Sequence, residues 1–295
     1  MATSFTNTLK QQLNTADTLQ RLLLVNAVVF VVIRLINSLS RLYNVPLLEF
    51  DFVNSWLAVP AAPLQLLHKP WTLITYMFYH WDFMHILFNM LWLFWMGKIF
   101  QEYLENKKLL TTYLLGGISG GILYILAYNL FPLFASSVEV SSALGASASV
   151  LAITIATATL LPDYAIHLLF FGPVKLKYIA LVTIFLDLIN VSGANAGGHI
   201  AHIGGALFGF IYIKQLKKGN DIAAWLSKLI DFITPGKKSR LKVSHSRRKS
   251  DEDYAASKKS KQERLDLILE KISKSGYGSL SSEERDFLFN ASKEK

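Results

Sequence analysis

Residues 141–149 read Ser-Ser-Ala-Leu-Gly-Ala-Ser-Ala-Ser and lead directly into an apolar run that ends near residue 161. Gly145 and Ala146 permit a tight turn, which places Ser147 at the start of a helix. There the unpaired N–H groups and the positive end of the helix dipole favour a negatively charged oxygen, as a nucleophilic serine requires. Small residues also serve as simple packing surfaces in membrane helices. A hydrolytic role for Ser147 therefore requires a base and an oxyanion site elsewhere in the chain.

Two further segments carry polar side chains within apolar stretches. In the first, His85 and Asn89 are four residues apart and share one face of a helix. In the second, His202 shares a helix face with the small residues Gly205 and Gly209, so this histidine can approach a neighbouring helix closely. Polar groups within membrane spans are costly and tend to mark function.

The composition predicts a protein that crosses the membrane several times. The chain has 295 residues, of which 52% are hydrophobic and 17% charged, and its mean hydropathy is +0.33. The net charge is +9, and the basic residues lie at the ends of apolar blocks and in the C-terminal tail. This distribution is typical of residues that orient a protein in a membrane. We therefore predict that the chain lies in a lipid bilayer and does not bind nucleic acid. The absence of cysteine excludes disulfides, thiolate metal sites and a cysteine nucleophile.

We expect an all-α polytopic fold with six transmembrane helices. The predicted spans are residues 21–39, 85–103, 109–131, 146–161, 178–191 and 199–213. Residues 40–70, rich in aromatic residues and proline, are expected to lie in the membrane interface. Lysines mark the loops after the second, fourth and sixth spans, whereas the loops after the third and fifth contain none. By the positive-inside rule both termini are then cytoplasmic.

This topology puts the four polar candidates at the outward ends of their spans. The fourth span is about 24 Å long as a helix, against roughly 30 Å of hydrocarbon, so Ser147 is expected to lie below the outer surface. Water must then reach Ser147 through a cavity.

The chain is predicted to have four parts. They are a cytoplasmic N-terminal segment (1–20), the six-helix domain (21–215), a basic cytoplasmic linker (216–261) and a small helical C-terminal extension (262–295). The extension has apolar positions at helical spacing, and a second helix start is indicated by Ser281, Ser282 and the two glutamates that follow.

Three motifs, in this order, resemble those of the rhomboid family of intramembrane serine proteases. They are H-W-D-F-M-H-I-L-F-N at 80–89, G-A-S-A at 145–148 and A-H-I-G-G at 201–205. The resemblance implies a rhomboid six-helix bundle in which Ser147 is the nucleophile and His202 the general base, a dyad without a carboxylate. It also implies an oxyanion site formed by His85, Asn89 and the backbone N–H of Ser147, with Gly145 close by. Substrates would be single-pass transmembrane proteins that enter past the fifth helix and are cleaved near the outer face.

The chain departs from the family pattern at three positions. Ala148 replaces the glycine usual after the serine, Leu151 replaces an aromatic residue, and Thr72 replaces the arginine of a Trp-Arg pair. None of these changes removes a reacting group. The tail after Lys261 resembles a cytoplasmic extension of some bacterial rhomboids, which implies a multi-pass protein of the bacterial inner membrane.

Two alternatives belong to other functional classes. A catalytically inactive rhomboid-like protein that binds membrane clients would usually lack the serine or the histidine, and this chain has both. A histidine-based metal or haem protein is permitted by seven histidines, but the chain has no H-E-x-x-H motif and no cysteine. We therefore expect neither a metal nor another cofactor. No pattern in the sequence specifies the substrate or the oligomeric state.

Other polar residues of the predicted bundle are interpreted more simply. His80 and His199 are expected to shape loops, because the motifs assign chemistry to other histidines. Asp187, near the outward end of the fifth span, could orient a histidine, but the resemblance to a family that works through a dyad disfavours this role.

Overall fold

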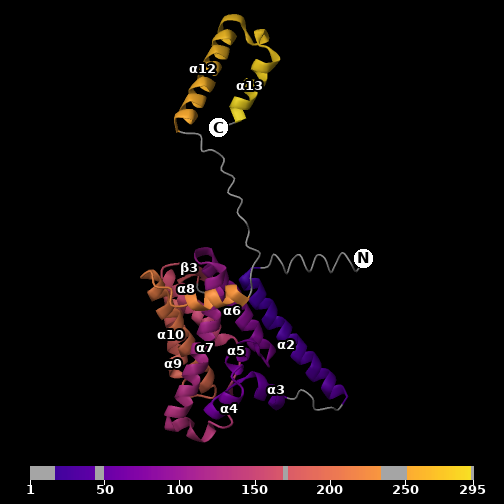
Figure 1. Ribbon diagram of the computed structural model, residues 1–295, viewed down its shortest axis with the longest axis vertical. Helices are drawn as coiled ribbons and strands as arrows, with labels where there is room; N and C mark the ends of the chain where they lie inside the picture. The colour runs from indigo at the N-terminus through magenta and orange to yellow at the C-terminus, as the bar shows by residue number, and fades with distance from the viewer. Residues whose placement is uncertain (1–16, 44–49, 169–171, 234–250, 294–295) are drawn as a thin grey trace. The chain divides into compact units, whose positions relative to one another are not determined.

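The chain forms two compact units, residues 1–236 and 237–295. In the computed structural model the described residues are 17–43, 50–168, 172–233 and 251–293. The first unit contains a helical bundle, and the second contains a pair of helices (Figure 1). Most of the predicted N-terminal segment and part of the predicted linker lie outside the described residues.

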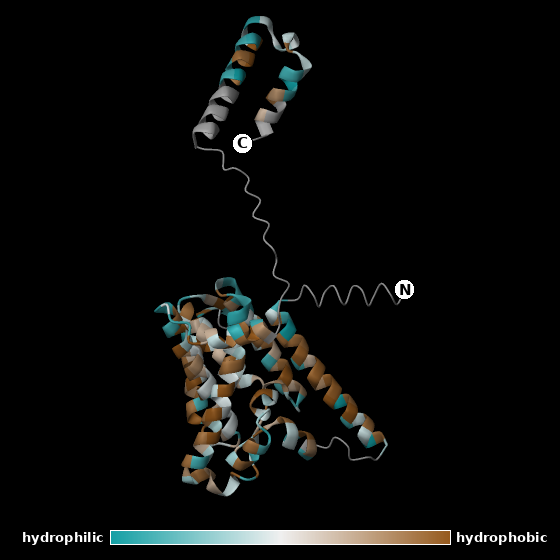
Figure 2. Cartoon of the chain, in the orientation of Figure 1, coloured by the Kyte–Doolittle hydropathy of each residue, from teal (hydrophilic) through white to brown (hydrophobic). Residues whose placement is uncertain are grey.

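Each of the six predicted spans overlaps one helix of the bundle, and the bounds differ by at most four residues. These helices are α2 (Thr18–Leu42), α6 (Phe83–Tyr103), α7 (Asn106–Leu130), α8 (Ser147–Leu160), α9 (Leu176–Ile189) and α10 (Ala196–Lys217). Among the described residues, α2, α6, α7 and α10 are long and apolar enough to cross a membrane, and hydrophobic residues predominate along α2 in Figure 2. Helices α8 and α9 have 14 residues each, about 21 Å in length. The predicted polytopic helical fold is confirmed.

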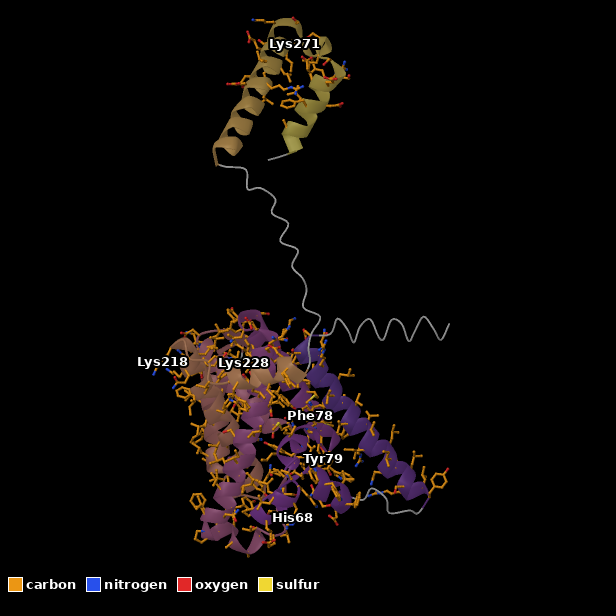
Figure 3. All side chains as sticks on the ribbon, in the orientation of Figure 1. His68, Phe78, Tyr79, Lys218, Lys228 and Lys271 are labelled. Carbon is orange, nitrogen blue, oxygen red and sulfur yellow. The ribbon has the colours of Figure 1, made fainter. Side chains whose placement is uncertain are left out.

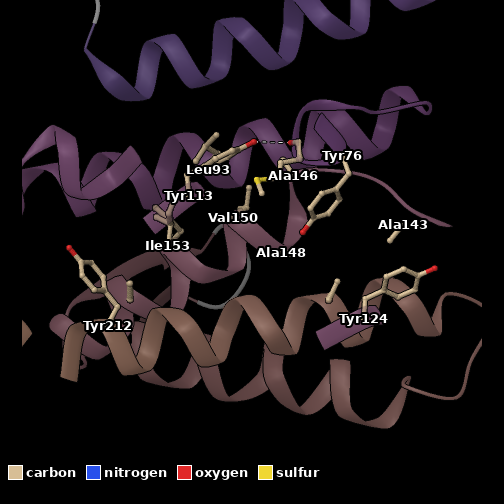
Figure 4. Close-up of a cluster of buried hydrophobic side chains, with 14 of the residues drawn as sticks. Tyr76, Leu93, Tyr113, Tyr124, Ala143, Ala146, Ala148, Val150, Ile153 and Tyr212 are labelled. Atoms are coloured by element: carbon tan, nitrogen blue, oxygen red, sulfur yellow. Dashed lines mark hydrogen bonds between the residues drawn. The ribbon is translucent and has the colours of Figure 1, made fainter. Parts of the chain in front are cut away.

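Helix α8 is the centre of the bundle. All of its residues from Ala148 to Ala158 are buried, and α6, α7, α9 and α10 each contact it. Figure 4 shows α8 side chains such as Val150 and Ile153 among buried residues of other elements, including Tyr113 and Tyr212. A helix that is apolar on every side is stable only when it is enclosed in this way.

Short elements between α2 and α6 hold the turn before α8. They are α3 (Phe50–Leu57), β1 (Val59–Pro60), α4 (Pro63–His68), α5 (Thr72–Thr75) and the 3₁₀ helix η1 (Tyr76–Phe78). Strand β1 pairs antiparallel with β2 (Ser142–Ala143), with Val59 opposite Ala143. Tyr79, which follows η1 (Figure 3), is buried in a small cluster with Ile33 of α2 and Val53 of α3. The strand pairing therefore holds the backbone at Ser142 and Ala143, shortly before Ser147, against the segment between α2 and α6.

The remaining elements of the first unit lie outside the site. They are the 3₁₀ helix η2 (Pro132–Ser137), the hairpin of β3 (Ala165–Leu168) and β4 (Gly172–Lys175), and α11 (Ala224–Ile233). Helix α11 exposes Trp225, Leu229 and Phe232 at helical spacing, while its Asp231 pairs with Lys107 of α7 at 2.7 Å. Its exposed apolar face is typical of a helix in the membrane interface.

The second unit is a helical hairpin made of α12 (Asp251–Ser275), the 3₁₀ helix η3 (Tyr277–Ser279) and α13 (Ser282–Lys293). Lys271 of α12 (Figure 3) pairs with Glu284 of α13 at 2.9 Å. Helix α12 begins at Asp251, so the end of the linker predicted at residue 261 falls inside a helix. Acidic residues at 251–253 complement the helix dipole, and the following alanines and lysines are good helix formers, so charge alone did not mark a linker here.

Candidate active site

Two hydrogen bonds and a close approach of His85 fix the turn that carries Ser147. Gly145 has φ +112°, a backbone conformation that residues with a Cβ rarely adopt. Its N–H donates to the carbonyl of Tyr76 at 2.9 Å, and a Cβ on Gly145 would lie 2.6 Å from Cε1 of His85. The next residue, Ala146, donates its N–H to Nε2 of His80 at 3.1 Å. Ser147 then begins α8.

His80 accepts a hydrogen bond from the backbone, in agreement with the role in shaping a loop that we expect from the sequence. Its side chain is fully buried. Burial is the main cause that lowers the pKa of His80 to about 3, and the nearby His85 is the second cause. The ring is therefore neutral, and its Nε2 lone pair accepts the Ala146 N–H. The rings of His80 and His85 are 5.1 Å apart in an edge-to-face arrangement, so His80 also supports the position of His85.

The four residues predicted to carry the chemistry line one cavity of about 390 Å³. Ser147 comes from α8, His202 from α10, and His85 and Asn89 from α6. The complete lining is Met84, His85, Phe88, Asn89, Trp92, Ser147, Val150, Leu151, Thr183 and His202. Most of the other lining side chains are apolar, so the polar groups converge within an apolar pocket.

The two α6 residues are held by their own helix. Asp82 caps α6 by accepting the N–H of His85 at 3.0 Å, which places His85 in the first turn. Asn89 is buried, with 7% exposure, and its Nδ2 donates to the carbonyl of His85 at 2.9 Å. One N–H of the Asn89 amide is thus engaged, and the side chain still lines the cavity.

Two glycines bring α10 against the backbone of α8. A Cβ on Gly205 would overlap the carbonyl oxygen of Ala148, and a Cβ on Gly209 would overlap that of Ala152. On α7, a Cβ on Gly120 would lie 2.7 Å from Cβ of Ala148. The methyl group of Ala148 thus lies in the helix packing, away from the lining of the cavity.

The structure also shows the surroundings of the other two residues that depart from the motif pattern. Leu151, where an aromatic residue is usual, is buried and lines the cavity. Thr72, where an arginine is usual, is buried and donates its hydroxyl to the carbonyl of Lys69 at 2.7 Å. Trp71 stacks on Trp56 with ring centres 5.8 Å apart.

Asp187 of α9 contacts the predicted base. Its Oδ1 lies 2.8 Å from Nδ1 of His202 and 2.8 Å from Nδ1 of His199, and the side chain is buried. The sequence signal was a single carboxylate near the end of an apolar span. Because the family that the motifs resemble works through a dyad, the sequence alone does not predict this contact.

Asp187, His199 and His202 are also the described residues that could hold a metal ion, since their ligand atoms lie within 4.8 Å of one another. Both nitrogen–oxygen separations are those of hydrogen bonds, and a single oxygen serves both rings. Hydrogen bonding therefore accounts for this arrangement without an ion.

Comparison with known proteins identifies the family. The rhomboid domain matches residues 67–218, just over half of the chain. The chain belongs to the rhomboid family. A second family, DUF6576, a family of unknown function, matches residues 249–294, which include the helical hairpin of this rhomboid protein.

Curated relatives of this rhomboid chain come from a plant and from bacteria. It is 28% identical over 218 residues to RHOMBOID-like protein 12, mitochondrial, of Arabidopsis thaliana, covering 71% of this chain and 61% of that protein. It is 26% identical over 159 residues to the rhomboid protease GlpG of Yersinia pseudotuberculosis, covering 54% and 52%. With GlpG of Salmonella newport it shares 35% identity over 69 residues, covering 23% and 25%. The chain thus spans about half to three fifths of the length of the first two relatives.

Proposed function

We propose that this rhomboid protein is an intramembrane serine endopeptidase with Ser147 as nucleophile and His202 as general base. The observation that carries the proposal is the cavity shared by Ser147, His202, His85 and Asn89. These residues come from three helices, and they are the ones that the three sequence motifs single out. Nothing in the site favours the inactive, client-binding alternative, because both reacting side chains are present and open into the same space.

In this mechanism the hydroxyl oxygen of Ser147 attacks the carbonyl carbon of the scissile peptide bond. His202 accepts the serine proton and then donates it to the leaving amine, which gives an acyl-enzyme on Ser147. Nδ1 of His202 contacts Asp187, so Nε2 is the ring nitrogen left for this proton transfer. A water molecule, activated by the same histidine, then hydrolyses the ester and restores Ser147.

The oxyanion formed during attack needs donors that are already in place. Ser147 is the first residue of α8, so its N–H has no partner within the helix and lies at the positive end of the helix dipole. Asn89 and His85 line the same cavity. We assign these three groups to the oxyanion site, where one donor typically contributes about 10²–10³ in turnover.

The lining of the cavity supports a proposal for the substrate class. Met84, Phe88, Trp92 and Leu151 make its wall largely apolar, which suits a segment of a transmembrane protein better than a soluble peptide. We propose single-pass membrane proteins as substrates, cleaved near the outer face, with both termini of the protease in the cytoplasm. The bacterial inner membrane is the proposed location, and the similarity to a mitochondrial plant protein makes an organelle membrane the second candidate.

The domain assignment is part of the proposal. We propose a six-helix protease domain, with the segments before and after it on the cytoplasmic side and the C-terminal hairpin as a separate extension. The match of a second family to residues 249–294 supports treating the extension as a unit of its own.

Purified full-length protein tests the function directly. We expect a fluorophosphonate probe to label the wild type but not Ser147→Ala, and a single-pass model substrate in proteoliposomes to be cleaved by the wild type alone. Labelling of Ser147→Ala at the wild-type rate would assign the reaction to another residue. A wild type that is folded, unlabelled and inactive on a panel of membrane substrates would favour the client-binding alternative.

A further inference from the structure

Asp187 is an unusual residue for its helix. Along α9 most of the large apolar side chains are exposed, including Leu181, Phe185 and Leu188, as expected for a helix that faces lipid. Of the residues of α9, only Leu176 and Asp187 are buried. A buried carboxylate in such a helix is costly unless it is paired. The polar contacts of Asp187 are therefore the reason for its position.

Those contacts are to two histidine rings from one face of α10. His199 and His202 are three residues apart, which places them side by side on a helix, and their ring centres are 5.9 Å apart. Oδ1 of Asp187 lies 2.8 Å from Nδ1 of each ring. Among the described residues, Oδ2 is buried without a hydrogen-bond partner. A carboxylate has only acceptors to offer, so both Nδ1 atoms act as N–H donors.

This arrangement determines which nitrogen of His202 can react. A neutral imidazole carries one proton, and the proton on Nδ1 that is donated to Asp187 leaves Nε2 with a free lone pair. His202 lines the cavity with Ser147. The ring is thus held in the tautomer that a general base needs, and its protonated form faces a carboxylate.

We propose that Asp187 is a positioning residue for His202, so that the catalytic unit comprises a serine, a histidine and a buried aspartate from a third helix. This inference rests on the proposed function, and it extends that function beyond a dyad. His199 has the supporting role: as a second donor to the same oxygen, it fixes the orientation of the carboxylate. Because Asp187 belongs to α9 and His202 to α10, the pair also joins the outer ends of these two helices.

The test compares Asp187→Asn and Asp187→Glu with the wild type as full-length protein in proteoliposomes. Asparagine keeps the size but can donate to Nδ1 and so favour the wrong tautomer. We expect Asp187→Asn to lower kcat for a model transmembrane substrate on the order of 10²-fold or more, with KM unchanged within about twofold because no group that binds substrate is altered. Fluorophosphonate labelling should slow in parallel. Asp187→Glu should recover part of the rate, since it retains the carboxylate.

Asp163→Asn is the matched control. Asp163 is exposed in the loop after α8 and pairs with Lys175 and Lys177, so the same chemical change there should leave kcat at the wild-type value. His199→Gln should lower kcat less than Asp187→Asn, because Asp187 still contacts His202.

A spectroscopic measurement keeps the inference testable if Asp187→Asn does not fold. In ¹⁵N-histidine-labelled wild type, with the His202 signal identified by its loss in His202→Gln, we expect an unprotonated Nε2 and a protonated Nδ1. The opposite tautomer overturns the positioning role, as does a wild-type kcat in a folded Asp187→Asn. Loss of activity in EDTA that zinc restores would also overturn it and would identify a metal site. A wild type that neither labels nor cleaves contradicts the proposed function instead, and the tautomer of His202 still tests the inference.

Discussion

Gly205 of α10 lies so close to α8 that a Cβ at this position would overlap the carbonyl oxygen of Ala148. Gly205 is one turn after His202 on the same helix face, and Ala148 directly follows Ser147. The contact between these two residues therefore sets the separation of the two helices immediately beside the proposed base and nucleophile. Small residues permit this approach of helix backbones.

Substitution of Gly205 should consequently separate Ser147 from His202. A displacement of about 1 Å can cost on the order of 10² in rate, so we expect Gly205→Leu to lose nearly all cleavage and fluorophosphonate labelling. Because the opposing atom belongs to the backbone and cannot rotate away, Gly205→Ala should also lose much of its activity, although less. Both variants should still insert in membranes, as a protease-protection assay can show.

A glycine with open space around it provides the comparison. A Cβ on Gly278, in the C-terminal hairpin, would have no neighbour within 4 Å, so Gly278→Ala should cleave at the wild-type rate. Wild-type activity of Gly205→Leu would mean that the contact between α8 and α10 does not control the approach of His202 to Ser147.

Ser147 and His202 should behave as one unit. We expect Ser147→Ala and His202→Ala each to abolish cleavage of a model transmembrane substrate, and the double variant to be no worse than either single one. The measurement is kcat/KM in proteoliposomes. Substantial turnover by His202→Ala would require a different base.

Asn89→Ala tests the oxyanion site. Loss of one donor should reduce kcat about 10²–10³-fold while leaving the protein folded. Asn190, which directly follows α9, is a matched control, because its Nδ2 also donates to the carbonyl four residues earlier, that of Leu186, at 2.7 Å. Asn190→Ala should retain full activity; if the two variants lose activity equally, the amide of Asn89 has a structural role.

The stability of the protein should depend on the protonation of His80. Its pKa in the folded protein is about 3, below the ordinary histidine value of 6.5, because the ring is buried, so the folded state resists protonation. The contribution of neutral His80 to the free energy of unfolding is complete above pH 6.5. It declines as the pH falls toward 3, by at most about 1.4 kcal/mol per pH unit. We expect Tm to fall between pH 6.5 and 4, and to fall less in His80→Gln, which keeps an acceptor for Ala146 but does not titrate.

His68→Gln controls for the loss of any one histidine, since His68 is exposed on α4. It should show the same dependence of Tm on pH as the wild type. If His80→Gln also matches the wild type, the acid sensitivity arises from other groups.

Topology can be tested with paired reporters. A reporter fused to the C-terminus should report a cytoplasmic position, and one inserted near Glu139, between α7 and α8, should report the outer side, because the lysines gather in alternate loops. The reverse pattern would put Ser147 at the cytoplasmic end of its helix and contradict cleavage near the outer face.

The sequence alone indicated the six main helices of the first unit, the order of the motifs and the residues that could react. Hydrophobic periodicity and length are local properties, so the bounds of these six helices could be predicted to within a few residues. The positions of Ser147, His85, Asn89 and His202 within their helices followed from the same spans. The linker was predicted to end at residue 261, but α12 already begins at Asp251, because charged residues suit both a solvated linker and an exposed helix.

The tertiary structure decided which side chains meet. The contact of Asp187 with His202 depends on how α9 and α10 are rotated about their axes, and the contact of His80 with Ala146 depends on the conformation of the loop before α6. Both are fixed by the packing of many residues far apart in the chain. In the sequence Asp187 is only a costly carboxylate in an apolar span. It becomes a partner for His202, the proposed base, because the glycines of α10 bring this helix against α8, and because α9 presents its one buried carboxylate to the histidine face of α10.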